Sequence, residues 1–225
     1  MSPRHARVLL VLFGLMVVVD LVSLGAGFGL GHRIAKPLLM PLLAAHAVGR
    51  GGPRLLVAAL LCGWGGDVLL LSDAGPAFLL GMASFAAGHV CYLVLFRRAA
   101  RARGVSTWLG GAYALALVAT VTLLWPDLPA DLRIPVAGYS LLLTAMAARS
   151  TRLGPVAGAG GALFMLSDTL IATGVADWPQ LPRSDLWIML TYAAAQFLLV
   201  SGVLGTLGAQ PAPTTAYGEM RSTTP

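Results

Sequence analysis

The sequence predicts an all-α membrane protein, a polytopic bundle of about eight transmembrane helices. The chain of 225 residues is 57% hydrophobic and only 11% charged, whereas a water-soluble domain has about 25% charged residues. Its mean hydropathy is +0.81. Most of the chain must therefore lie in lipid, where only helices and closed barrels satisfy every backbone N–H and C=O. The apolar runs are far longer than the roughly 10-residue alternating segments of a barrel, so helices are favoured.

The apolar segments are expected, in order, to be transmembrane helices, and most reach the roughly 17–25 residues that a crossing needs. The first follows Arg4 and Arg7, which would suit a signal peptide, but Asp20 falls where such a peptide stays apolar and no clear A-x-A site follows. The second is the weakest, because it is short, begins at Lys36 and Pro37 and contains another proline. We expect it to be tilted, kinked or partly re-entrant. The predicted segments are 8–24, 34–48, 55–71, 77–96, 107–125, 132–148, 155–175 and 186–207.

Short connectors that contain Pro, Gly and Asp join these segments, as turns do. Residues 1–208 are therefore predicted to form one transmembrane helical domain. Residues 209–225 are polar and rich in Pro and Thr, a composition that predicts a disordered C-terminal tail.

Arginines gather in alternate connectors, on the side of the membrane that also holds both termini. The positive-inside rule places that side in the cytoplasm, and we expect a multi-pass protein of a bacterial plasma membrane. The net charge of +6 is explained by this topology and does not predict nucleic-acid binding, since the arginines lie in separate short loops without interleaved aromatic residues. The arginine-rich side holds Arg4, Arg7, Arg50, Arg54, Arg97, Arg98, Arg101, Arg103, Arg149, Arg152 and Arg221, and the other side holds Arg33, Lys36, Arg133 and Arg183 with Asp73, Asp127, Asp131, Asp177 and Asp185.

Two aspartates lie inside long apolar segments, Asp67 in the third and Asp168 in the seventh. A carboxylate at the bilayer centre costs roughly 2.5–3.5 kcal/mol on insertion scales, so such residues usually have a function. A purely structural carboxylate that pairs with a base or caps a backbone group is the alternative. Counted down from Asp73 and Asp177, the two carboxylates lie at about 9 Å and about 13 Å depth. They are therefore predicted to share one layer in the outer half of the bilayer.

The even offset between the third and seventh segments means that both run in the same direction. This predicts a parallel repeat of two four-helix halves, with its axis along the membrane normal. In such a repeat the two carboxylates would face one another across a central cavity.

Several other polar side chains fall near the same layer. Lys36 is the only lysine among 15 basic residues, which suggests a specific role for an ammonium group, with Asp67 or Asp20 as counter-ion. A snorkelling lysine at the interface is the equally weighted alternative. Tyr192 and Gln196 are four residues apart and share a helix face. The candidate residues beside the aspartates are Lys36, His89, Tyr139, Tyr192 and Gln196.

A set of short elements occurs in order along the chain, and together they resemble the YhhN family of multi-pass membrane proteins, which includes the lysoplasmalogenases. The resemblance runs from about the second segment to the eighth. One departure is Thr191, where the family often has a tyrosine before Tyr192. The elements are Lys36-Pro37 before a leucine-rich run, Gly66-Asp67, Gly88-His89 with Tyr92, Gly161-Ala162-Leu163-Phe164 before Ser167-Asp168, and Tyr192 with Gln196.

The resemblance implies hydrolysis of the vinyl ether bond of a lysoplasmalogen to a fatty aldehyde and a glycerophospho-ethanolamine or -choline. Such cleavage needs one protonated acid and one base to activate water, and it needs no metal or other cofactor. Paired carboxyls in an apolar cavity suit this need, because they do not readily ionise together. Asp67 and Asp168 are the expected catalytic pair. Which aspartate is the acid cannot be read from the sequence. Lys36 or His89 would bind the phosphate or hold the carboxylates, while Tyr139, Tyr192 and Gln196 would hydrogen-bond the glycerol or the water.

Other function classes are consistent with buried carboxylates. A proton-coupled transporter also places them at mid-membrane, and the glycines just before Asp67 would permit an interrupted helix. A non-catalytic protein would bind lysolipid without altering it. An intramembrane aspartyl protease is disfavoured, because Trp64 occupies the first glycine position of its GxGD element. A zinc hydrolase is disfavoured too, because only His89 lies deep, while Cys62 and Cys91 have no motif spacing.

Overall fold

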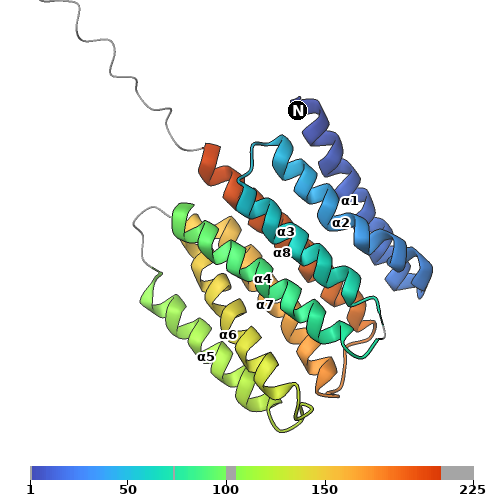
Figure 1. Cartoon of the computed structure of the whole chain (residues 1–225), viewed down its shortest axis with the longest axis vertical. Coiled ribbons are helices and arrows are strands. Elements are labelled where there is room, and N and C mark those ends of the chain that lie inside the picture. The colour runs from blue at the N-terminus through green and yellow to red at the C-terminus, as the bar shows by residue number, and fades with distance from the viewer. Residues whose placement is uncertain (1, 73, 100–104, 209–225) are drawn as a thin grey trace, which may run out of the picture.

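The computed structural model describes residues 2–72, 74–99 and 105–208 (Figure 1). Over these residues the chain forms eight α-helices, one short 3₁₀ helix and no strand, which confirms the all-α prediction. Asp73, Arg101, Arg103, Arg221 and the predicted tail 209–225 lie outside the described residues. The helices are α1 (Pro3–Ala26), α2 (Gly29–Gly49), α3 (Arg54–Leu69), α4 (Ala77–Ala99), α5 (Thr107–Leu124), α6 (Arg133–Ser150), α7 (Pro155–Val175) and α8 (Ser184–Gly208), with the 3₁₀ helix η1 (Thr151–Leu153) between α6 and α7.

The helices lie side by side along a common direction, with α1 and α2 on one flank and α5 on the other (Figure 1). The closest pairs are α1 with α2, α3 with α4 and α7 with α8. Helix α6 packs on both α4 and α7, whereas α5 rests mainly on α6. The centre of the bundle is therefore built from α3, α4, α6, α7 and α8, and the parallel repeat stays a prediction.

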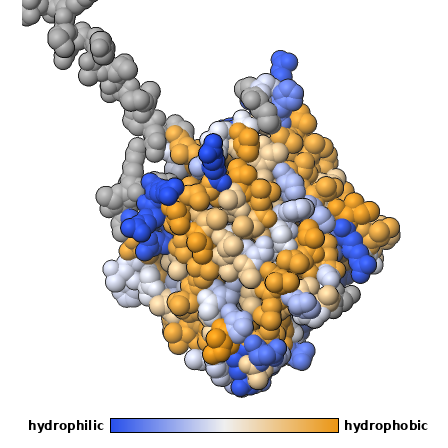
Figure 2. Space-filling model, viewed as in Figure 1, coloured by the Kyte–Doolittle hydropathy of each residue, from blue (hydrophilic) through white to orange (hydrophobic). Residues whose placement is uncertain are grey.

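Five helices are long and apolar enough to cross a membrane, namely α1, α4, α5, α7 and α8. Hydrophobic side chains cover most of the middle of the face seen in Figure 2, and hydrophilic ones gather toward the helix ends. The chain is therefore a helical membrane bundle. Helix α3 has only 16 residues. Helix α2 contains Arg33, Lys36 and two histidines, and α6 has one arginine near each end. Membrane crossing by these three helices, and the cytoplasmic placement of both termini, stay predictions.

Helix α2 differs from the predicted short segment that begins at Lys36. It is a continuous helix that starts at Gly29 and contains both Pro37 and Pro41. Gly27 makes this early start possible, because its left-handed conformation (φ 73°) ends α1 and reverses the chain within two residues. Lys36 therefore lies about two turns inside the helix and not at its beginning.

Pro41 leaves a gap in the hydrogen bonding of α2. It has no N–H, so the carbonyl of Pro37, four residues earlier, lacks its usual partner within the helix. Trp64 of α3 supplies that partner, with Nε1 donating to the Pro37 carbonyl at 2.9 Å. Helix α2 thus tolerates Pro41, because the neighbouring helix α3 supplies a hydrogen bond to the Pro37 carbonyl.

Replacing Trp64 by Phe is expected to destabilise the protein by about 0.5–1.5 kcal/mol, the net value of an ordinary hydrogen bond, because it leaves the partly exposed Pro37 carbonyl unpaired. The measurement is thermal unfolding of the purified protein in one detergent. Trp108→Phe is the matched control, since Trp108 of α5 is 90% exposed. Equal stability of the two variants would show that the Trp64 hydrogen bond has no such role.

Candidate active site

Asp67 lies almost fully buried on α3, with 2% of its surface exposed. Tyr192 of α8 donates a hydrogen bond from its hydroxyl to Asp67 Oδ2 at 2.8 Å. Lys36 of α2 places Nζ 4.0 Å from Asp67 Oδ1. The predicted counter-ion relation between Lys36 and Asp67 is thus present in the structure. Helix α3 runs unbroken past Asp67.

The glycines before Asp67 make room for its neighbours rather than interrupting α3. A Cβ at Gly63 would lie 3.2 Å from the Tyr192 hydroxyl and from Gln196 Nε2, and one at Gly66 would overlap the ring of Phe85. Small residues at these positions therefore let α4 and α8 approach the carboxylate closely.

Hydrogen bonds extend from Asp67 through α8 to α4. Gln196 Nε2 donates to the Tyr192 hydroxyl at 3.4 Å, and the Tyr92 hydroxyl donates to Gln196 Oε1 at 2.7 Å. All three side chains are buried. In this series of hydrogen bonds every donor points toward Asp67, so the network favours negative charge on the Asp67 carboxylate. Tyr92 was noted in the sequence beside His89, but its contact with Gln196 was not predicted.

A second network surrounds Asp168 of α7. The Tyr139 hydroxyl of α6 donates a short hydrogen bond to Asp168 Oδ2. His89 of α4 places Nε2 3.0 Å from the same hydroxyl. Because the hydroxyl proton points to Asp168, His89 Nε2 is the donor in this contact. His89 Nδ1 is buried and has no hydrogen-bond partner among the described residues.

Aromatic rings separate the two networks. Phe164 packs edge-on against Tyr192 on the Asp67 side, at 5.5 Å between centroids, and against His89 on the Asp168 side, at 4.8 Å. Phe85 lies 5.9 Å from Tyr192 and 6.3 Å from Phe164. Each carboxylate has its own hydrogen-bond partners. The structure therefore brings the predicted residues together as two adjacent groups.

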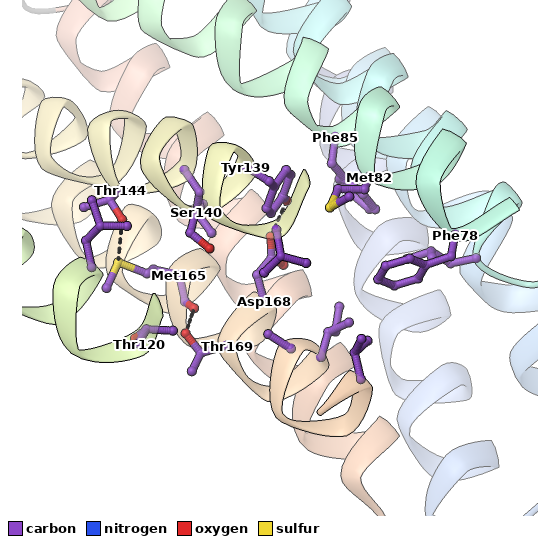
Figure 3. A pocket seen from close by; sticks show the side chains of 17 residues that line it. Phe78, Met82, Phe85, Thr120, Tyr139, Ser140, Thr144, Met165, Asp168 and Thr169 are labelled. Atoms are coloured by element: carbon purple, nitrogen blue, oxygen red, sulfur yellow. Dashed lines mark hydrogen bonds between the residues drawn. The ribbon is translucent and has the colours of Figure 1, made fainter. Parts of the chain in front are cut away.

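A cavity opens beside Asp168, among α4, α5, α6 and α7 (Figure 3). About 720 Å³ of empty space lies among its side chains, including the space at its open side. Of the predicted site residues, Asp168 and Tyr139 line it, and Figure 3 shows the two pointing toward one another. The other predicted residues do not line it, namely Asp67, Lys36, His89, Tyr192 and Gln196.

Four hydroxyl residues in the cavity wall were not predicted from the sequence, namely Thr120, Ser140, Thr144 and Thr169. Ser140 follows Tyr139 and Thr169 follows Asp168, so adjacency to a candidate residue was the available signal. The Thr169 hydroxyl donates to the Met165 carbonyl at 2.8 Å, which leaves the wall beside it mostly apolar.

A further pair lies between α1 and α2. Asp20 Oδ1 is 2.7 Å from His32 Nδ1, and Asp20 is 1% exposed. His32 lies in the first turn of α2, near the start of that helix. Asp20 thus pairs with His32, and Lys36 lies beside Asp67. Among the described residues, no three His, Cys, Asp or Glu side chains cluster as a metal site would require.

The chain is similar in sequence to proteins that are named lysoplasmalogenase. The chain is 38% identical over 157 residues to the human lysoplasmalogenase TMEM86B, an alignment that covers 68% of the chain and 65% of the human protein, just under two-thirds. It is 37% identical over 169 residues to the pig protein of the same name, covering 72% and 70%. It is 32% identical over 209 residues to a lysoplasmalogenase of Mycobacterium tuberculosis, covering 84% and 78%.

No solved structure matches the chain. The named relatives support the expectation of a lysoplasmalogenase-type membrane hydrolase. The YhhN family matches residues 31–203, which are most of the chain and include both carboxylates. The resemblance seen in the sequence is confirmed, and the chain belongs to the YhhN family.

Proposed function

We propose that this protein hydrolyses the vinyl ether bond of a lysoplasmalogen and releases a fatty aldehyde and a glycerophospho-ethanolamine or -choline. The observation that carries the proposal is the carboxyl of Asp168 in the wall of an apolar cavity, with a second buried carboxyl, Asp67, in the adjacent network. The named relatives support the substrate class.

The reaction needs a proton delivered to carbon. In our proposal Asp168 is the acid, because it lines the cavity and Asp67 does not. Its Oδ2 accepts from Tyr139, so Oδ1 carries the proton. Transfer of that proton to the alkene carbon farther from the ether oxygen leaves an oxocarbenium ion. Water adds to this ion and returns a proton to Asp168, and the hemiacetal then breaks its bond to the glycerol oxygen, giving aldehyde and alcohol.

The remaining residues support this cycle in distinct ways. Asp67 provides the negative charge that stabilises the developing cation. Lys36, Tyr192 and Gln196 hold Asp67 in place, through the contacts described above. Tyr139 stabilises the carboxylate that Asp168 becomes after proton transfer, and His89 fixes the Tyr139 hydroxyl. Tyr139 is also placed to contact the bound lipid, since it lines the cavity.

The test is incubation of the purified full-length protein with paired lysolipids that differ only in the bond at the first glycerol carbon. We expect free aldehyde from the 1-alkenyl lysolipid and none from its saturated 1-alkyl counterpart, measured by mass spectrometry. Release of fatty acid from a 1-acyl lysolipid instead would identify a different hydrolase. Lysolipid binding or solute flux without turnover would favour the two non-hydrolytic alternatives, a lysolipid-binding protein and a proton-coupled transporter.

A further inference from the structure

An apolar groove lies between α5 and α7, next to the cavity. About 700 Å³ of empty space, including its open side, lies among its side chains. Met165 and Thr169 belong to the lining of both the groove and the cavity. The two spaces therefore adjoin. The groove is lined by Leu109, Ala112, Tyr113 and Ala116 of α5 and by Ala162, Met165, Leu166 and Thr169 of α7.

The groove exists because α5 and α7 scarcely touch. Only Leu124 is buried among the residues of α5, so the helix packs on one neighbour and leaves its other side open. The facing positions Ala112, Ala116 and Ala162 carry small side chains, which leave space between the helices. Leu109 and Leu166 are 45% and 48% exposed, so the groove opens to the outside of the bundle, where hydrocarbon tails would lie.

The direction of the groove matches how a lipid lies in a membrane. The cavity is lined near the start of α4 by Phe78 and near the end of α7 by Val175, at the end of the bundle that is predicted to face outward. The groove follows α7 from Thr169 back to Ala162, a rise of about 10 Å that runs inward across the bilayer centre. A lipid of the outer leaflet has its polar end outward and its chain inward, as this path requires.

We propose that the cavity and the groove form one continuous apolar slot, which receives the single hydrocarbon chain of a lysolipid entering sideways from the bilayer between α5 and α7. This inference rests on the proposed function, and it names the binding path for its substrate. The chain would occupy the groove, and the first carbons after the glycerol oxygen would lie beside Asp168. The Thr169 hydroxyl, at the point where the two spaces adjoin, already donates within α7 and needs no partner in the slot.

Photolabelling tests the slot without requiring turnover. The probe is a saturated 1-alkyl lysolipid with a diazirine at the end of its chain, added to the full-length protein in lipid nanodiscs. We expect mass spectrometry to find the label on groove residues of α5 and α7, and excess unlabelled lysolipid to remove it. Label spread over all lipid-facing helices, or found mainly on α1, would overturn the slot. That outcome would leave aldehyde release by the wild-type protein, and hence the proposed function, unaffected.

A pair of tryptophan variants tests the same path by comparing substrates with long and short hydrocarbon chains. Ala116→Trp fills the groove, whereas Ala114→Trp adds the same bulk at an exposed position that lines neither space. Loss of contact with about two methylenes predicts a KM raised about tenfold for long-chain substrates. A short-chain substrate should be turned over as by wild type, and Ala114→Trp should match wild type for both. Equal behaviour of the two variants would contradict the slot.

Discussion

Asp168→Asn is expected to lower aldehyde release by about 10²–10⁴-fold, the usual contribution of a general acid. The amide oxygen can still accept the hydrogen bond from Tyr139, so the local packing is kept. The amide has no proton to give to the alkene carbon. The measurement is the rate of aldehyde formation from a 1-alkenyl lysolipid by the purified protein.

The matched control is Asp177→Asn, just beyond the end of the same helix. It makes the same chemical change at an exposed site, and the left-handed backbone there (φ 55°) suits asparagine. We expect wild-type activity from the control and an unchanged unfolding midpoint in both variants. Near-normal activity of Asp168→Asn would remove this carboxyl from the mechanism.

Asp67→Asn is expected to affect both activity and stability. Loss of its charge removes the stabilisation of the oxocarbenium ion. A direct electrostatic contact is worth about 10²–10³ in rate, and because Asp67 does not line the cavity we expect a smaller loss. It also leaves the ammonium of Lys36, which is 9% exposed, without the carboxylate 4.0 Å away. Removing one partner of a buried ion pair destabilises by up to about 3–5 kcal/mol, and the long distance here predicts less. Aldehyde assays and thermal unfolding measure the two effects separately.

Adding Lys36→Met to Asp67→Asn separates the two effects. The double variant has no unpaired buried charge, so its stability should recover while its activity stays low. A lysine that reaches the membrane interface would not depend on Asp67, and Asp67→Asn would then leave the unfolding midpoint unchanged. Recovery of activity in the double variant would contradict a direct role for the Asp67 charge.

Depth along a helix could be predicted from the sequence, because it follows from counting residues between charged connectors. This reasoning placed Asp67 near Tyr192 and Gln196, and the structure joins Asp67 to Tyr192 and Tyr192 to Gln196 by hydrogen bonds. The direction in which each side chain points across the bundle could not be predicted in this way. The rings of Phe85 and Phe164 lie between the two carboxylate networks because of how the helices rotate and pack. Helix rotation and packing cannot be deduced from one sequence.

The positions where helices begin could not be predicted accurately from the sequence either. Apolar length alone began the second segment at residue 34, since Gly31, His32 and Arg33 come directly before it. Gly27 turns the chain before that point, so α2 begins at Gly29. Contacts with neighbouring helices then keep polar residues inside α2. The pairing of His32 with Asp20 depends on that turn and was not predictable from hydropathy.

The loose attachment of α5 bears on how this protein should be handled in solution. Detergents are themselves single-tailed amphiphiles, and a micelle presents them at high concentration to the open side between α5 and α7. We expect them to compete with the natural lipid there, so that catalytic rates fall as detergent rises above its micellar threshold. Turnover in detergent-free bilayers is the appropriate measure of the enzyme.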